Sequence, residues 1–136
     1  MWPSDTRILL VDDAAPARKS IALCLNQLGY QNITEAEDGR SALEILESRV
    51  DTETSIQLIV CDWQMEHLDG HDFLVEVRKW EETKKIPFIM VTSHNSIDPV
   101  FKAITAGVTD YMIKPIDTST LKKKLEAAFK RVTNKP

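Results

Sequence analysis

The sequence predicts an α/β fold in which helices cover both faces of a parallel β-sheet. Strand-like runs alternate five times with segments in which apolar residues recur every three or four positions. Strands that alternate with helices imply βαβ units and a parallel sheet, and right-handed crossovers leave few topologies open. A chain of 136 residues suits one such domain and leaves little room for a second.

Five short segments have the composition of strands. The first reads RILLV, and the third, LIVCD, is the most apolar and ends on a carboxylate. The second, NITEAE, carries polar residues, which indicates a strand at the edge of the sheet. The predicted strands are residues 7–11, 32–37, 58–62, 88–93 and 110–114.

Apolar residues at helical spacing follow each predicted strand. They are Ala17, Ile21, Leu25 and Leu28; Ala42, Leu43, Leu46 and Val50; Phe73, Val77 and Trp80; Val100 and Ile104; and Leu121, Leu125, Ala128 and Val132. Pro16 lies near the start of the first helix, and Gly29 follows its last apolar residue. Ser96 can cap the fourth helix, and either Asp117 or Thr118 can cap the fifth.

Charge and cysteine content exclude several classes of protein. A net charge of −4 argues against a nucleic-acid-binding surface, and the basic run at residues 122–124 fits a solvated helix face. Cys24 and Cys61 lie in apolar segments without metal-binding spacing, which predicts buried free thiols. No apolar stretch approaches the ~20 residues of a membrane span, and MWPSDTR lacks the features of a signal peptide. We therefore expect a cytoplasmic protein without membrane contact.

Ionisable and hydroxyl side chains stand at the carboxyl ends of four predicted strands, where ligands bind in such sheets. They are Asp12 and Asp13, then Asp62, then Thr92 and Ser93, and then Lys114, which Pro115 follows. Any one aspartate can simply cap the next helix. Three carboxylates a few ångströms apart, however, repel by about 1 kcal/mol per pair in water and more in a lower dielectric. Lys114 offsets one negative charge, which leaves a place for a divalent cation.

Oxygen ligands without clustered His or Cys favour a hard cation, and Mg²⁺ fits best because it binds few carboxylates and keeps several waters. His67, His71 and His94 are scattered and are predicted to be surface residues, not ligands. A carboxylate beside Mg²⁺ and a lysine suits attack on phosphorus, because the cations neutralise charge on the transferring group. The sequence has no Walker loop, GxGxxG or GxSxG motif, so the phosphoryl donor is expected to be another molecule.

Over about residues 7–132 the sequence resembles response-regulator receiver domains of two-component signalling, most closely the single-domain chemotaxis type. The resemblance is carried by ILLVDD, LGYQNITEAEDGRSALEIL, CDWQMEHLDG, PFIMVTS, AGVTDYMIKP and LKKKLEAAF. It implies a flavodoxin-like, doubly wound (βα)5 fold with strand order 2-1-3-4-5. It further implies a single domain over residues 1–136 that is no enzyme beyond its own phosphoryl transfer and dephosphorylation.

The resemblance also implies a role for each residue of the site. Asp62 matches the phosphoacceptor, and Lys114 matches the lysine that pairs with the phosphoryl group. The implied Mg²⁺ site consists of Asp62, Asp13 as a direct ligand, Asp12 acting largely through water, and the backbone carbonyl of Gln64. Thr92 and Tyr111 match the residues that report phosphorylation, and the Lys114–Pro115 bond matches a cis peptide, which X–Pro adopts at modest cost.

Four positions are expected to tune the lifetime or access of the phosphorylated state. Glu66 stands where the family commonly has proline, and it adds negative charge near the pocket. Gln64 and His94 occupy the two positions that set this lifetime in the family. Ser93 is small, which is expected to leave the pocket open to phosphoryl donors.

The resemblance also implies partners for the domain. They are a histidine kinase or phosphotransfer protein, a phosphatase, and a target protein or second copy at the face formed by the fourth helix, fifth strand and fifth helix.

Two alternatives to a phosphorylated receiver remain at this point. A haloacid-dehalogenase-type phosphohydrolase also uses an aspartate nucleophile, but it has a second Asp where Gln64 stands. A receiver-like module can also bind partners without phosphorylation. Flavin binding is disfavoured because VDDAAPAR places carboxylates where a phosphate would sit.

Overall fold

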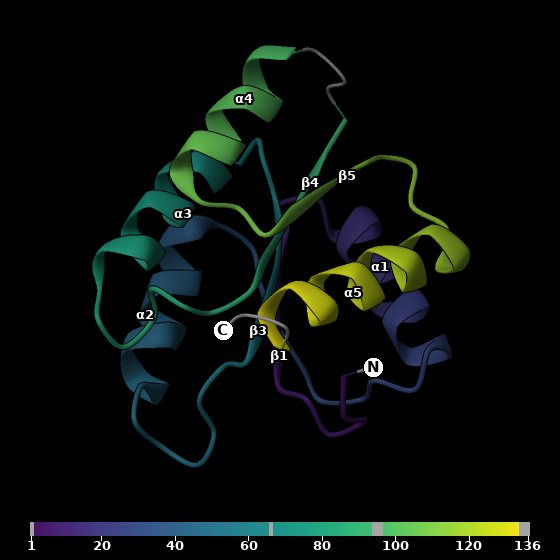
Figure 1. The fold of residues 1–136 in the computed structure, drawn as a ribbon, viewed down its shortest axis with the longest axis horizontal. Helices are drawn as coiled ribbons and strands as arrows, with labels where there is room; N and C mark the ends of the chain where they lie inside the picture. The colour runs from purple at the N-terminus through teal and green to yellow at the C-terminus, as the bar shows by residue number, and fades with distance from the viewer. Residues whose placement is uncertain (1, 66, 94–96, 134–136) are drawn as a thin grey trace.

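The computed structural model describes residues 2–65, 67–93 and 97–133. Its five strands form one parallel sheet in the order β2-β1-β3-β4-β5, which confirms the predicted fold class and strand order (Figure 1). The strands are β1 (Ile8–Val11), β2 (Ile33–Ala36), β3 (Leu58–Asp62), β4 (Phe88–Thr92) and β5 (Asp110–Ile113). The helices are α1 (Ala15–Gln27), α2 (Gly39–Arg49), α3 (Gly70–Lys79), α4 (Ile97–Ala106) and α5 (Thr118–Thr133).

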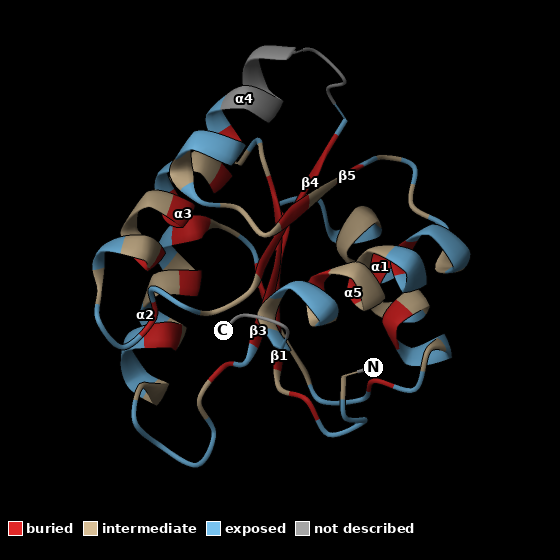
Figure 2. Ribbon diagram, in the orientation of Figure 1, coloured by how far each residue is buried: buried red, intermediate tan, exposed pale blue. Residues whose placement is uncertain are grey.

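Helices cover both faces of the sheet, with α1 and α5 on one side and α2, α3 and α4 on the other (Figure 1). The strands β1, β3 and β4 are buried along their whole length (Figure 2), because alternate side chains enter two separate cores. Ile8, Leu10 and Val60 belong to the core under α1 and α5, whereas Leu9 and Ile59 belong to the core under α2 and α3. This double burial explains why β1, β3 and β4 are almost continuously apolar.

The ends of the helices follow capping chemistry. Gly29 has a φ of +98° just after α1, a conformation that glycine adopts without strain. Asp117 is the N-cap of α5, because its carboxylate accepts a hydrogen bond of 2.7 Å from the Thr120 amide. Ser96, the predicted cap of α4, lies outside the described residues. Within the described part of the chain, no helix combines the length and apolar character that a bilayer crossing requires.

Several residues differ from the predicted apolar stripes. Leu28, Val50 and Trp80 cap the C-terminal ends of their helices and lie outside them. Ile104 is 59% exposed, whereas Ala103, one position earlier on α4, is buried. The predicted burial of Cys24 is only partly correct, since it is half-buried, while Cys61 is fully buried, and both thiols are free.

The basic run at residues 122–124 is only partly the solvated face that was predicted. Lys122 and Lys123 are exposed, but Lys124 lies against the sheet. Its ammonium is 3.2 Å from the carboxylate of the buried Asp110 and 5.3 Å from the centre of the Tyr111 ring. Lys124 therefore connects α5 to β5.

Candidate functional site

The parallel strands bring Asp12, Asp62 and Lys114 together at their carboxyl ends. Asp62 ends β3, while Asp12 and Lys114 directly follow β1 and β5. The Lys114 ammonium lies 3.0 Å from Asp12 Oδ2 and 3.5 Å from Asp62 Oδ1. One lysine therefore pairs with two carboxylates that come from neighbouring strands.

Asp13 completes a group of three carboxylates. Oxygen atoms of Asp12, Asp13 and Asp62 all lie within 4.8 Å of one another, with Asp12 and Asp62 buried and Asp13 exposed. The donor set consists of carboxylate oxygens alone, as a hard divalent cation prefers. The exposure of Asp13 leaves one side of the group open to water, which Mg²⁺ retains when it binds proteins. The residues present therefore fit a magnesium ion.

The electrostatics of Asp62 are set by burial. Its side chain is largely removed from water, and this desolvation raises its pKa to about 6. Lys114 opposes the shift, whereas the negative charge of Asp12 adds to it. Burial also acts to lower the pKa of Lys114, but its contacts with Asp12 and Asp62 outweigh burial, and the net shift is upward. Lys114 is thus held as a cation beside a carboxylate that is costly to ionise.

Replacing Lys114 with methionine is expected to raise the pKa of Asp62 further, above about 6, because the main interaction that favours the ionised carboxylate is lost. An NMR titration that follows the Asp62 side-chain carboxyl carbon in metal-free protein measures this pKa. The exposed Lys122, replaced in the same way, is the control and should leave it unchanged. An unshifted Asp62 in the Lys114 variant would contradict this account of the site.

The other predicted site residues lie at or near the same edge. Thr92 is buried at the end of β4, and its carbonyl accepts a hydrogen bond of 2.8 Å from the Lys114 amide. Ser93 is exposed, and Tyr111 is half-buried on β5. The Lys114–Pro115 peptide bond is cis, the isomer that the resemblance implies.

The loop after β3 lies on the open side of the carboxylates. Gln64 is exposed, and together with Met65 and Asp69 it lines a shallow hollow that also includes Asp13. Glu66, together with His94 beyond β4, was predicted to tune the site, but both lie outside the described residues.

The two described histidines differ. His67 is exposed, as predicted, and its Nδ1 lies 3.2 Å from Asp38 Oδ2. His71 is half-buried, because its ring packs 5.4 Å from the Trp63 ring. His71 also belongs to a second possible ligand group with Asp69 and Asp72. The carboxylate of Asp69 already caps α3 through the Asp72 amide, so this group has a structural explanation.

Sequence reasoning missed the glycine that closes the loop after β3. The Gly70 amide donates a hydrogen bond of 2.8 Å to the Trp63 carbonyl. A Cβ atom at Gly70 would lie only 2.1 Å from the Asp62 carbonyl oxygen. The pair Asp69–Gly70 is a turn signal in the sequence, but nothing in the sequence shows this close backbone approach.

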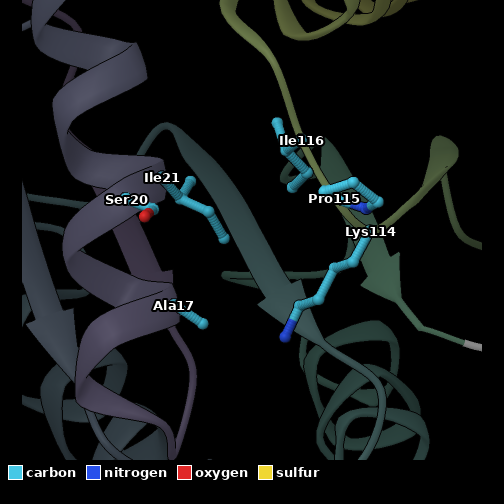
Figure 3. Close-up of a pocket in the computed structure, with 6 residues that line it drawn as sticks. All are labelled: Ala17, Ser20, Ile21, Lys114, Pro115 and Ile116. Atoms are coloured by element: carbon cyan, nitrogen blue, oxygen red, sulfur yellow. The ribbon is translucent and has the colours of Figure 1, made fainter.

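A pocket of about 410 Å³ opens beside Lys114, between α1 and the segment after β5 (Figure 3). It is lined by Ala17, Ser20, Ile21, Lys114, Pro115 and Ile116. Ala17, Ser20 and Ile21 on α1 form one wall, and the Lys114 side chain extends from the other wall (Figure 3). The pocket therefore gives an approach to the ammonium from outside the carboxylate group.

Comparison with known proteins agrees with this geometry. Residues 8–126 match the response regulator receiver domain family. The chemotaxis protein CheY of Pseudomonas aeruginosa is 39% identical over 93% of this chain and 98% of its own length. CheY1 of Helicobacter pylori is 38% identical over 90% of this chain and 96% of its own. Neither relative supports a phosphohydrolase of the haloacid-dehalogenase type.

Solved structures show the same likeness. The chemotaxis response regulator CheY4 of Vibrio cholerae superposes with a TM-score of 0.80 at 27% identity, covering 91% of this chain and 98% of that chain. The receiver domain of the sensor histidine kinase PA1611 of Pseudomonas aeruginosa gives a TM-score of 0.79 at 27% identity, covering 96% and 99%. That structure has a magnesium ion coordinated in its active site cleft.

Proposed function

The chain belongs to the response regulator receiver domain family, and on this premise we propose that its phosphoryl acceptor is Asp62. The observation that carries the proposal is the contact of one lysine with two carboxylates. Lys114 lies 3.5 Å from Asp62 and 3.0 Å from Asp12, at the strand ends where α/β sheets bind ligands. The chain is proposed to form one receiver domain over residues 1–136, with its core at about residues 7–132.

Asp62 acts as the nucleophile in this mechanism. Its carboxylate oxygen attacks the phosphorus of a phosphohistidine on a kinase or phosphotransfer protein, and the bond from phosphorus to the imidazole nitrogen breaks. The product is an aspartyl phosphate, a known kind of covalent intermediate. Lys114 stays charged and pairs with the new phosphoryl oxygens, which offsets part of their negative charge.

Asp13, Asp12 and the backbone carbonyl of Gln64 are proposed to hold Mg²⁺ together with Asp62. When bound, the ion supplies positive charge that favours the ionised form of Asp62 and neutralises the transferring phosphoryl group. Asp12 is fully buried and is already bonded to Lys114 and to the Ala14 amide. We therefore assign it to holding Lys114 and ordered water in place, and Asp13 to direct ligation.

The signal is proposed to pass through Thr92 and Tyr111. The Thr92 hydroxyl is placed at the end of β4, where it can donate a hydrogen bond to a phosphoryl oxygen. Such a contact exists only in the phosphorylated state, so it shifts the equilibrium between two conformations. Tyr111 lies on β5 beside Lys124 of α5, and it therefore carries the change toward the surface of α4, β5 and α5.

A target protein or a second copy of the chain is proposed to bind that surface. Ile104 and Ile113 are large exposed apolar residues on α4 and β5, as expected of a surface that another protein covers. A phosphatase is a further proposed partner, and self-catalysed phosphoryl transfer and hydrolysis are the only reactions proposed. A cytoplasmic location belongs to the same proposal, supported by two free cysteines.

Incubation of the protein with acetyl phosphate and Mg²⁺ is expected to add about 80 Da, one PO₃H unit, on Asp62. Intact-mass and peptide mass spectrometry detect and locate this adduct. Asp62→Asn should abolish the adduct, because the amide is not a nucleophile of this kind, and chelation of the metal should suppress it. Asp72→Asn, at an exposed carboxylate on α3, is the control and should keep it. An equal adduct in the Asp62 variant overturns the assignment.

A further inference from the structure

The loop that joins β3 to α3 carries part of the proposed magnesium site. Gln64 and Asp69 lie on it, and both line the hollow that contains Asp13. The base of the loop is closed by the hydrogen bond from the Gly70 amide to the Trp63 carbonyl. The position of the Gln64 backbone therefore depends on what holds the remainder of the loop.

The far side of this loop is held by the N-terminus of α2. His67 Nδ1 lies 3.2 Å from Asp38 Oδ2, and the Gly39 amide donates a hydrogen bond of 3.2 Å to the Leu68 carbonyl. A Cβ atom at Gly39 would lie 2.4 Å from that carbonyl oxygen. Glycine at this position is therefore what allows the loop and the helix to approach each other so closely.

The loop needs such contacts because its backbone is unfavourable by itself. His67 and Leu68 have φ values of +54° and +93°, in a region where residues with a Cβ are rarely found. Conformations of this kind are energetically unfavourable and persist where the surrounding structure holds them. Leu68 adds a packing contact, since it is half-buried against the core under α2 and α3.

The Asp38 carboxylate contacts both α2 and the loop after β3. Its Oδ1 accepts a hydrogen bond of 2.8 Å from the Ser41 amide, which caps α2, while its Oδ2 faces His67. The Ser41 amide, followed by His67, lowers the pKa of Asp38, so that this carboxylate is charged at neutral pH. Asp38 therefore links the start of α2 directly to the loop.

We propose that Asp38, Gly39 and His67 form a clamp through which the N-terminus of α2 positions the loop after β3 for magnesium binding. They are positioning residues, because no atom of theirs is assigned to the metal. This inference rests on the proposed function, in which Gln64 of the same loop is a ligand. It assigns α2, which lies apart from the α4-β5-α5 surface, to the control of metal affinity.

The test compares magnesium affinities by isothermal titration calorimetry. Asp38→Ser keeps a capping hydroxyl for α2 but is too short to reach His67, and His67→Ala removes the other partner. Each variant is expected to weaken Mg²⁺ binding about threefold, the scale of one partly exposed ion pair. The double variant should be no weaker than either single one, because both remove the same contact. Asp117→Ser, at the matching cap of α5, is the control and should leave the affinity unchanged.

A second measurement needs no metal. In metal-free protein, ¹⁵N relaxation of the Trp63 to Gly70 amides should show increased motion in Asp38→Ser and His67→Ala, but not in Asp117→Ser. Unchanged relaxation and affinity in both clamp variants would overturn the clamp, as would fully additive effects in the double variant. If the wild-type protein binds no Mg²⁺ while the loop still loosens, the contact between α2 and the loop holds, but the proposed function fails and with it the control of metal affinity by α2.

Discussion

Metal-free protein that carries Asp62→Asn is expected to be more stable than the wild type by about 2–3 kcal/mol at about pH 8, since a shift of one pKa unit corresponds to about 1.4 kcal/mol. Burial raises the pKa of Asp62 from 3.8 in a free side chain to about 6 in the fold. The folded state thus binds this proton more tightly than the unfolded state. Ionisation of Asp62 therefore opposes folding, and asparagine removes that cost.

The stability difference between Asp62→Asn and the wild type depends on pH. Below the unfolded pKa of about 4, both states are protonated, and the neutral carboxyl carries no penalty. Stability is lost as the pH rises from there through the folded pKa of about 6, and above that value the loss is complete. The advantage of Asp62→Asn should therefore be small at about pH 4 and constant above about pH 7.

Urea unfolding of both proteins in a chelator, repeated across this pH range, measures the difference. Asp5→Asn, at an exposed carboxylate near the N-terminus, controls for the loss of one negative charge. Added Mg²⁺ should reduce or reverse the advantage, because an ion that binds only the folded wild type stabilises it by mass action. Equal stabilities of the two proteins in chelator at about pH 8 would show that burial does not make ionisation of Asp62 unfavourable.

Most of the sheet is predictable from the sequence because its central strands are buried on both faces. The prediction for β3 has the observed bounds, and the other strands are shorter by one residue at one or both ends. The meeting of Asp12, Asp62 and Lys114 follows from the strand order, since each residue stands at a strand end. A strand fixes the position of such a side chain through the register of the sheet.

Helix ends and the loop after β3 were less predictable. Leu28, Val50 and Trp80 continue an apolar spacing by one position past the last helical residue, so spacing alone cannot separate a cap from a helix interior. The contact of His67 with Asp38 joins residues 29 positions apart. A local pattern does not contain such a contact, because it arises only when α2 and α3 pack side by side.

Gly70→Ala is expected to destabilise the protein by about 3 kcal/mol, the upper range for overpacking, and to impair phosphorylation of Asp62. The added Cβ would lie 2.1 Å from the Asp62 carbonyl oxygen and 2.9 Å from the Trp63 Cα. Both are backbone atoms, so neither can rotate aside as a flexible side chain does. Either α3 moves outward or the end of β3 is displaced, and the second change moves Asp62, the proposed nucleophile.

Gly29→Ala is the matched comparison for this variant. Its φ of +98° strains any residue with a Cβ, but an added Cβ there meets no atom within 4 Å. Backbone strain alone should then cost about 1–2 kcal/mol and leave phosphorylation by acetyl phosphate at the wild-type rate. Urea unfolding and mass spectrometry of the adduct measure the two effects separately. If Gly70→Ala matches Gly29→Ala in both measurements, the close approach at Gly70 does not hold Asp62, the proposed phosphoacceptor, in place.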